Sequence, residues 1–255
     1  MHLAQDFQEL FSFAALISLL TLSVLEIVLG IDNIIFISIT ADRLPRAQQG
    51  RARTSGLLLA LIMRILLLCC ISFIAGLKNP LFSIGDFGVT GRDIILFSGG
   101  VFLLYKTTVE LHNKIQGYDE SGIKIKKTSF NAIVMQIVLI DIVFSFDSIL
   151  TAVGLVTNLL IMIFAVIIAM IIMIVFSGKV SDFINNNPTI KVLALSFLLM
   201  IGMVLILDSF HQHIDKKYIY LSIAFSLFVE MLNIRMRKKS KKPPLDNNND
   251  LRDVI

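Results

Sequence analysis

Charge is scarce in this chain. Asp, Glu, Lys and Arg make up 16% of its 255 residues, whereas hydrophobic residues make up 56%. Because about a quarter of the residues of a soluble domain are usually charged, the composition excludes an ordinary soluble protein and indicates an integral membrane protein. The net charge of +4 does not indicate a nucleic-acid partner, since the basic residues lie in connections and in the tail, where membrane orientation explains them.

Cysteine and proline are rare as well. The two cysteines, Cys69 and Cys70, are adjacent within an apolar run, so they cannot form a CxxC pair, and we expect them to be structural residues buried in lipid. The prolines are expected to fall outside the membrane-spanning helices, because proline breaks a helix. They are Pro45, Pro80, Pro188, Pro243 and Pro244.

Motifs for covalent chemistry are missing too. The sequence has no nucleotide-binding loop and no pairing of a nucleophile with a base. We therefore expect neither an enzyme, nor a bound cofactor, nor pumping driven by ATP. The N-terminus lacks the positive start of a signal peptide and its apolar run is too long for one, so this run is expected to stay in the protein as a span.

What the chain has in abundance is long apolar runs. Seven of them are long enough to cross a hydrocarbon core of about 30 Å. We therefore predict an all-α membrane protein with seven transmembrane helices, built as a single domain over residues 1–238 and followed by a polar, disordered tail over residues 239–255. The predicted spans are about 11–39, 55–77, 93–111, 130–151, 156–177, 191–208 and 217–234.

Basic residues set the expected orientation. Lys and Arg are concentrated in the connections between spans 1 and 2, 3 and 4, and 5 and 6, and in the tail. The connections on the other side carry few: Lys78, Arg92, Lys216 and Lys217. By the positive-inside rule, the N-terminus is predicted outside and the C-terminus in the cytoplasm.

One short motif occurs twice. Its first copy, Leu25–Ile35, reads LEIVLGIDNII, and its second copy, Ile140–Leu150, reads IDIVFSFDSIL. Each copy puts two acids into a predicted span, where a carboxylate costs about 2.5–3.5 kcal/mol on insertion scales. Such a cost indicates a functional site. The four acids are Glu26, Asp32, Asp141 and Asp147.

In the predicted orientation the two copies run in opposite directions across the membrane. A second echo supports this symmetry, because Ser98 and Glu110 in span 3 have the same spacing as Ser196 and Asp208 in span 6. We therefore predict a 3+3 inverted repeat plus a seventh helix, an arrangement that places the binding site near the midplane on interrupted helices. The two halves and the extra helix cover about 11–111, 130–208 and 217–234.

Helical spacing puts most polar residues of each copy on one face. These faces are Ser23, Glu26, Gly30 and Asn33 in span 1, and Asp141, Ser145 and Ser148 in span 4. Asp32 and Asp147 lie about 120° away from them. They join the same site only if neighbouring helices surround them or the helix is locally broken, and Gly30 and Ser145 are the candidates for such breaks.

The candidate ligand atoms are all oxygens. Carboxylates, an amide and hydroxyls suit hard cations such as Mg²⁺, Ca²⁺ or Mn²⁺, whereas zinc or copper would call for thiolate or imidazole ligands. Clustered acids in a dry interior also tend to hold protons, and the residue types do not separate cation binding from proton carrying. Arg64, half-way through span 2, is a candidate counter-ion; alternatively, the acids pair with it only to hold helices together.

Polar residues at the ends of spans 3 and 6 are further candidates. Glu110, His112 and Asp208 could be gate or access ligands of the site; alternatively, they are ordinary solvated helix ends. Lys106 and Glu110 are four residues apart and can pair on one helix face.

With these motifs the sequence resembles the TerC family of integral membrane proteins, in particular its short YgdQ-type branch. The likeness reaches about residue 238 and includes Gly99–Leu103, Glu110–His112, Thr151–Gly154 and the pair Glu230 and Asn233. The resemblance implies a fold related to the LysE-type exporters and a role in manganese export, metal homeostasis or tellurite resistance. It implies that the metal-site positions are Glu26, Asp32, Asn33, Asp141, Asp147 and Ser148.

We therefore expect a transporter in the lipid bilayer of a bacterial inner membrane that exports Mn²⁺, or a similar hard divalent cation, by alternating access of its two halves, with protons as the coupling ion. One alternative is a proton-coupled exporter of a small organic solute. Another is a membrane scaffold that helps to load metal onto exported proteins.

Overall fold

The computed structural model of the chain describes residues 12–70, 80–85, 87–116, 129–156, 158–212, 214 and 216–240. They belong to two compact units, Met1–Ile214 and Asp215–Ile255. The described part of the second unit is one helix, α10 (Lys216–Ser240). This helix includes the first two residues of the predicted disordered tail, and the rest of the tail lies outside the described residues.

Helices make up most of the described residues of the first unit. They are α2 (Phe13–Leu29), α3 (Ile31–Ala41), α4 (Arg46–Cys69), α6 (Gly91–Ile115), α7 (Phe130–Leu155), α8 (Leu159–Asn185) and α9 (Pro188–Ser209).

The described residues contain six helical stretches that are long and apolar enough to cross a membrane. They are α2 with α3, then α4, α6, α8 and α9, and Lys217–Met236 of α10. The fourth predicted span corresponds to α7, whose apolar stretch Phe130–Phe146 is shorter. The prediction of a helical membrane protein is therefore confirmed, with six such spans rather than seven in the part of the chain that is described.

Two helix starts follow from local chemistry. Pro188 is the first residue of α9, where a proline has no helical hydrogen bond to lose, so this proline lies within the helix and not before it. At the start of α6, Thr90 Oγ1 accepts a hydrogen bond from the Asp93 N–H, and Asp93 Oδ2 accepts one from the Thr90 N–H. This capping box satisfies two N–H groups that have no partner within the helix.

A β-hairpin that the all-α prediction did not include precedes α6. Its antiparallel strands are β1 (Pro80–Ile84) and β2 (Phe87–Thr90). The chain reverses through Gly85, whose φ of +63° is accessible to glycine at little cost. The two strands are too short to stand out in a sequence dominated by long apolar runs.

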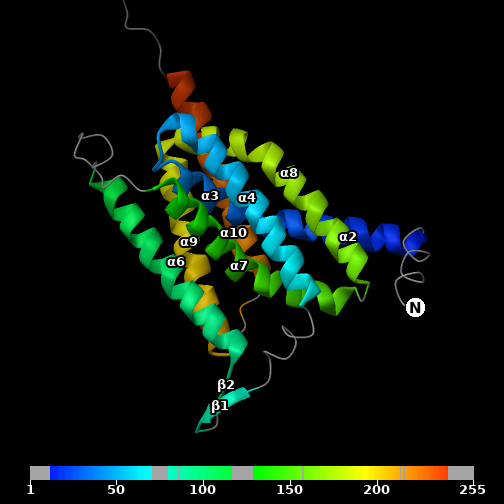
Figure 1. Ribbon diagram of the computed structural model, residues 1–255. Helices are drawn as coiled ribbons and strands as arrows, with labels where there is room; N and C mark the ends of the chain where they lie inside the picture. Colours follow the sequence, from blue (N-terminus) through cyan, green and yellow to red (C-terminus); the bar gives the residue numbers. More distant parts are fainter. Residues whose placement is uncertain are drawn as a thin grey trace, which may run out of the picture. The chain divides into compact units, whose positions relative to one another are not determined.

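The helices of the first unit pack in a definite set of pairs (Figure 1). Helix α6 lies along α9, α4 packs against α7 and α8, and α8 also packs against α2 and α3. The approach of α6 to α9 is close enough that a Cβ atom on Gly100 would lie 2.8 Å from the carbonyl oxygen of Gly202. Small residues of this kind let membrane helices bring their backbones together.

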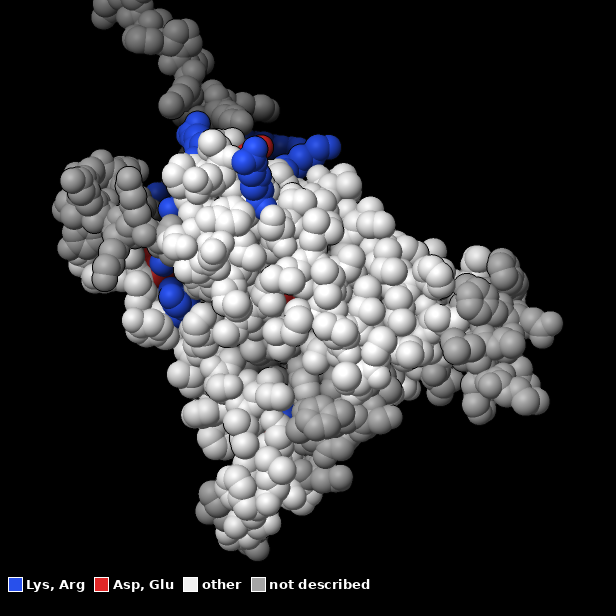
Figure 2. Space-filling view, in the orientation of Figure 1, with Lys and Arg blue, Asp and Glu red and all other residues white. Residues whose placement is uncertain are grey.

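Apolar side chains face outward and a set of charged side chains faces inward. Phe13, Leu20 and Val175 are more than 60% exposed, whereas Glu26 and Arg64 are each 2% exposed. On the face drawn in Figure 2, Lys and Arg gather toward the end that carries the start of α4, and most of the remaining surface is uncharged. Such a surface suits lipid, and charges placed inside it are usually functional.

Candidate functional site

Arg64 is the centre of a buried polar network. It lies in α4, and its guanidinium contacts side chains from two other helices. Nη1 donates to Glu26 Oε2 at 2.5 Å, and Nη2 donates to Asp141 Oδ1 at 3.2 Å. Glu26 is in the last turn of α2 and Asp141 is in α7. One cation therefore joins the first acid of each copy of the repeated motif.

Asp141 accepts the most hydrogen bonds within this network. Its Oδ2 accepts from Arg64 Nε at 3.4 Å and from Ser145 Oγ at 3.1 Å. Its Oδ1 accepts from Asn33 Nδ2 at 3.2 Å, in addition to the bond from Arg64. Ser145 Oγ also accepts from Arg64 Nε at 2.6 Å. Buried charges are tolerated only with such partners, so α2, α3, α4 and α7 are held together here by polar bonds.

The helix of the first motif copy is interrupted at Gly30. Helix α2 ends at Leu29 and α3 begins at Ile31. The N–H of Gly30 donates to the carbonyl of Ile27, three residues earlier, which is a tighter turn than that of an α-helix. Asp32 then lies in the first turn of α3 and is buried. A helix start favours a carboxylate, because its N–H groups carry partial positive charge.

The second motif copy has no equivalent interruption. Helix α7 runs without a break from Phe130 to Leu155, so the prediction of a break at Ser145 is wrong. A serine has a side chain that fits a regular helix, and the Ser145 hydroxyl bonds Asp141 one turn earlier on the same helix. At Gly30, by contrast, a Cβ atom would lie 2.5 Å from Met173 Sδ of α8, so any larger residue would require the Met173 side chain to move.

The other predicted metal-site residues are placed differently. Ser148 Oγ donates to the carbonyl of Ser145 within its own helix, and the side chain of Asp147 lies outside the described residues. Among the side chains that the structure describes, no group of three His, Cys, Asp or Glu residues is arranged to hold a metal ion. The six-residue metal site therefore stays a prediction, of which Glu26, Asn33 and Asp141 are joined in one network.

Glu110, one of the candidate gate residues, is part of an ion pair at the end of α3. Arg43 donates to Glu110 Oε2 through Nε at 2.8 Å and also through Nη2. Glu110 is thus bonded to Arg43 and not to Lys106, the partner that its helical spacing suggested. Of the other two candidates, His112 is exposed and Asp208 is buried at the end of α9.

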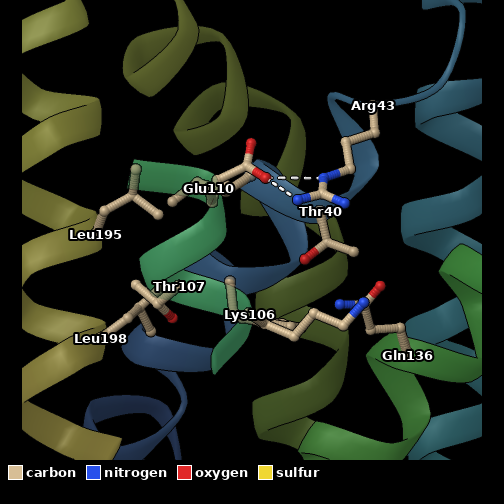
Figure 3. Close-up of a pocket in the computed structure, with 10 residues that line it drawn as sticks. Thr40, Arg43, Lys106, Thr107, Glu110, Gln136, Leu195 and Leu198 are labelled. Atoms are coloured by element: carbon tan, nitrogen blue, oxygen red, sulfur yellow. Dashed lines mark hydrogen bonds and ion pairs between the residues drawn. The ribbon is translucent and has the colours of Figure 1, made fainter. Parts of the chain in front are cut away.

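A small pocket of about 20 Å³ lies beside this ion pair (Figure 3). Its walls come from α3, α6, α7 and α9, together with Arg43, which follows α3. The polar side chains that line it are Thr40, Arg43, Lys106, Thr107, Glu110 and Gln136, and the apolar ones are Phe36, Ile39, Leu195 and Leu198.

A second polar cluster at the end of α3 was missed in the sequence analysis. Lys191 Nζ bonds Asp42 Oδ2 at 2.6 Å, and Asn185 Nδ2 donates to Asp42 Oδ1 at 3.1 Å. Lys191 belongs to the connection between predicted spans 5 and 6, whose basic residues were interpreted only as markers of orientation. Its position at the start of an apolar run was the available signal, because a lysine that enters such a run needs a partner.

Comparisons with known proteins agree with this membrane architecture. The sequence profile described as "Integral membrane protein TerC family" matches residues 11–243. The chain is 47% identical over 226 residues to the UPF0053 inner membrane protein YgdQ of Escherichia coli, covering 89% of this chain and 95% of that protein. No solved structure matches the chain.

Two longer Escherichia coli proteins are also similar. The UPF0053 inner membrane protein YoaE is 51% identical over 216 residues, which are 84% of this chain and 42% of YoaE. The UPF0053 protein YegH is 48% identical over 216 residues, again 84% of this chain and 41% of YegH. The chain therefore spans less than half the length of these two relatives, but nearly the whole of YgdQ.

Proposed function

The chain belongs to the TerC family and is an integral protein of a bacterial inner membrane, and from this premise we propose that it exports Mn²⁺ or a similar hard divalent cation. The observation that carries the proposal is the meeting of Glu26 and Asp141 on one buried guanidinium, that of Arg64. Two acids from separate copies of one motif thus bind the same positively charged group.

The groups around Arg64 have the chemistry of a site for a hard cation. When Arg64 moves aside, the carboxylates of Glu26 and Asp141 become available, together with the Ser145 hydroxyl. Asn33 Oδ1 is buried and has no hydrogen-bond partner within the described part of the chain, which makes it a further oxygen ligand. Divalent Mg²⁺, Ca²⁺ and Mn²⁺ prefer such oxygens, and two positive charges balance two carboxylates as Arg64 alone does not.

The pairing of helices supports alternating access between two related halves. Suppose that a two-fold operation exchanges α2 and α3 with α7, α4 with α8, and α6 with α9. The contact between α4 and α7 is then equivalent to the contact of α8 with α2 and α3. The same operation exchanges the two members of the α4–α8 pair and of the α6–α9 pair, so each of these contacts is mapped onto itself. A pseudo-two-fold axis would produce this pattern, and transporters with inverted repeats bind substrate near such an axis. Protons that enter the site as the metal ion leaves would then bind to the carboxylates.

The proposal is tested by measuring manganese in cells after a Mn²⁺ load. Cells that express the wild type are expected to hold less manganese than cells without the protein. Glu26→Gln, Asp141→Asn, Asp32→Asn and Asp147→Asn, expressed at equal membrane levels, are expected to lose this effect. Asp182→Asn removes an exposed acid of α8 and is the matched control that should behave like the wild type. Equal manganese with and without the wild-type protein would contradict the proposal.

A structural role, as in a membrane scaffold, is the second candidate. It is favoured by the bonds that Arg64 already makes to both acids and to Ser145. In that case the neutral combination Glu26→Gln, Arg64→Met and Asp141→Asn would keep the biological activity of the protein, because it keeps the shape of the network. A transporter that binds its cation through these acids would lose activity in the same variant.

A further inference from the structure

The pocket beside Arg43 is close to the acidic network along α3. Thr40, in its wall, follows Asn33 by two helical turns, which is a distance of about 10 Å along the helix. Figure 3 shows Thr40 and Arg43 on one side of the pocket, Glu110 and Thr107 on the other, and Gln136 opposite Lys106. The pocket therefore lies between the network and the Lys- and Arg-rich end at which α4 starts.

Two polar groups in the pocket have no polar partner among the described residues. Thr107 is 2% exposed, and its Oγ1 has no hydrogen-bond partner among the described residues. Lys106 has no carboxylate within ion-pair distance in that part of the chain; its ammonium lies 5.8 Å from the ring centre of Phe102. In Figure 3 the Lys106 side chain extends toward Gln136 and away from Glu110. A buried hydroxyl is normally paired, so Thr107 lacks the partner that its burial calls for, and the half-buried Lys106 has an ammonium group that is available to a carboxylate.

The ion pair of Arg43 and Glu110 joins two parts of the wall. Arg43 lies two residues beyond the end of α3, and Glu110 is near the end of α6. The side chains are 23% and 12% exposed, so the pair is partly withdrawn from solvent and stronger than a surface pair. While it is intact, α3 and α6 are held together across the pocket.

Lys106 offers Glu110 a second partner on the same helix. The two residues are four apart on α6, the spacing at which opposite charges meet on a helix face. Turning Glu110 from Arg43 to Lys106 would break the bond between α3 and α6 and would make a bond within α6. The carboxylate keeps a cation in both states, so the change leaves no acid buried without a positive partner.

We propose that Glu110 is the moving element of a gate, bonded to Arg43 when the pocket is closed and to Lys106 when it is open. The pocket is then the access chamber through which the cation passes between the acidic network and the Lys- and Arg-rich end. In the open state the second oxygen of Glu110, the Thr107 hydroxyl and the Gln136 amide face that chamber. This inference rests on the proposed transport function for its substrate, but the exchange of partners can be tested without transport.

The test measures how fast a cysteine at position 107 reacts with a charged thiol reagent. Cys69 and Cys70 are exposed and free, so both are first replaced by serine. Thr107→Cys is then introduced, and labelling is followed in open membrane fragments that admit the reagent from both faces. Three second-site variants are compared: Arg43→Gln, Lys106→Met and, as the matched control, Arg46→Gln, which removes an exposed arginine at the start of α4.

The two pocket variants are expected to shift labelling in opposite directions. Arg43→Gln leaves Glu110 with Lys106 and should raise the labelling rate about fivefold, the effect of losing an ion pair of ordinary strength. Lys106→Met leaves Glu110 with Arg43 and should lower the rate below that of the parent. Arg46→Gln should leave it unchanged. Exchanging the charges, as Arg43→Glu with Glu110→Arg, should restore slow labelling.

Equal labelling in all backgrounds would overturn the gate. So would a rise in both Arg43→Gln and Lys106→Met, because that result would show loosened packing and not an exchange of partners. Manganese measurements on the same variants separate the two proposals. If labelling shifts as expected but the wild type does not lower cellular manganese, the gate stands and manganese export fails. If manganese is lowered but labelling does not respond, export stands and the gate fails.

Discussion

Asn33 donates its side-chain N–H to Asp141 Oδ1 at 3.2 Å, so the two copies of the repeated motif are in direct contact. Asn33 follows the second acid of the first copy, and Asp141 is the first acid of the second copy. Arg64 completes the connection by bonding Glu26 and Asp141 from a third helix. Replacing one of these four residues therefore leaves its partners buried without a bonding group. The loss of stability depends on the bonds that the replacement breaks.

Arg64→Met should be strongly destabilising, because it leaves Glu26 and Asp141 buried without their cation. We expect a loss of about 3–5 kcal/mol in the free energy of unfolding, the usual cost of breaking a buried ion pair from one side. Thermal unfolding of the purified protein in detergent would measure it. The combination Glu26→Gln, Arg64→Met and Asp141→Asn should recover most of the loss. A single variant as stable as the wild type would show that the network contributes nothing to stability.

The two acids should differ in their importance for stability. Asp141 accepts bonds from Arg64, Asn33 and Ser145, whereas Glu26 accepts one bond from Arg64. Because each hydrogen bond to a charged group contributes about 1.5–3 kcal/mol, Asp141→Asn should lower the unfolding free energy more than Glu26→Gln by at least that amount. Denaturation of both variants in the same detergent tests the difference, and equal losses would contradict it.

The contact between α6 and α9 should not tolerate a side chain at Gly100. A Cβ atom there would lie 2.8 Å from the Gly202 carbonyl and 3.1 Å from the Ile206 amide nitrogen. These are backbone atoms that cannot turn away, so Gly100→Ala should cost about 1–3 kcal/mol. Gly178→Ala in α8 is the control, since nothing lies within 4 Å of its Cβ position. This control should be neutral or gain up to about 1 kcal/mol from better helix propensity.

Gly30→Ala should affect stability through Met173. The new methyl group would lie 2.5 Å from Met173 Sδ, and because a methionine side chain is flexible, we expect a cost of only about 1 kcal/mol. Met173→Val shortens that side chain and should make room for the methyl group. The double variant should therefore be at least about 0.5 kcal/mol more stable than the sum of the single effects. Strict additivity would show that the two residues do not compete for space.

Much of this site could be predicted from the sequence, but not its bonds. The repeated acids identified Glu26 and Asp141, and the apolar context of Arg64 identified a cation for them. The partner of Glu110 was different, because Arg43 lies on another segment and helical spacing reports only neighbours within one helix. Ser145 was interpreted as a helix break, whereas it is a bonding partner of Arg64 and Asp141; its spacing is compatible with both roles.

The sequence by itself determined that this protein is a helical membrane protein of the TerC family with acids in its interior, because composition, length of apolar runs and repeated motifs are local properties of the chain. Tertiary structure alone decided which acid meets which cation, which of the two motif helices is interrupted, and that Glu110 lies between two possible partners. Those outcomes depend on which helices pack together, and a charge inside the membrane bonds whatever group the packing brings within reach.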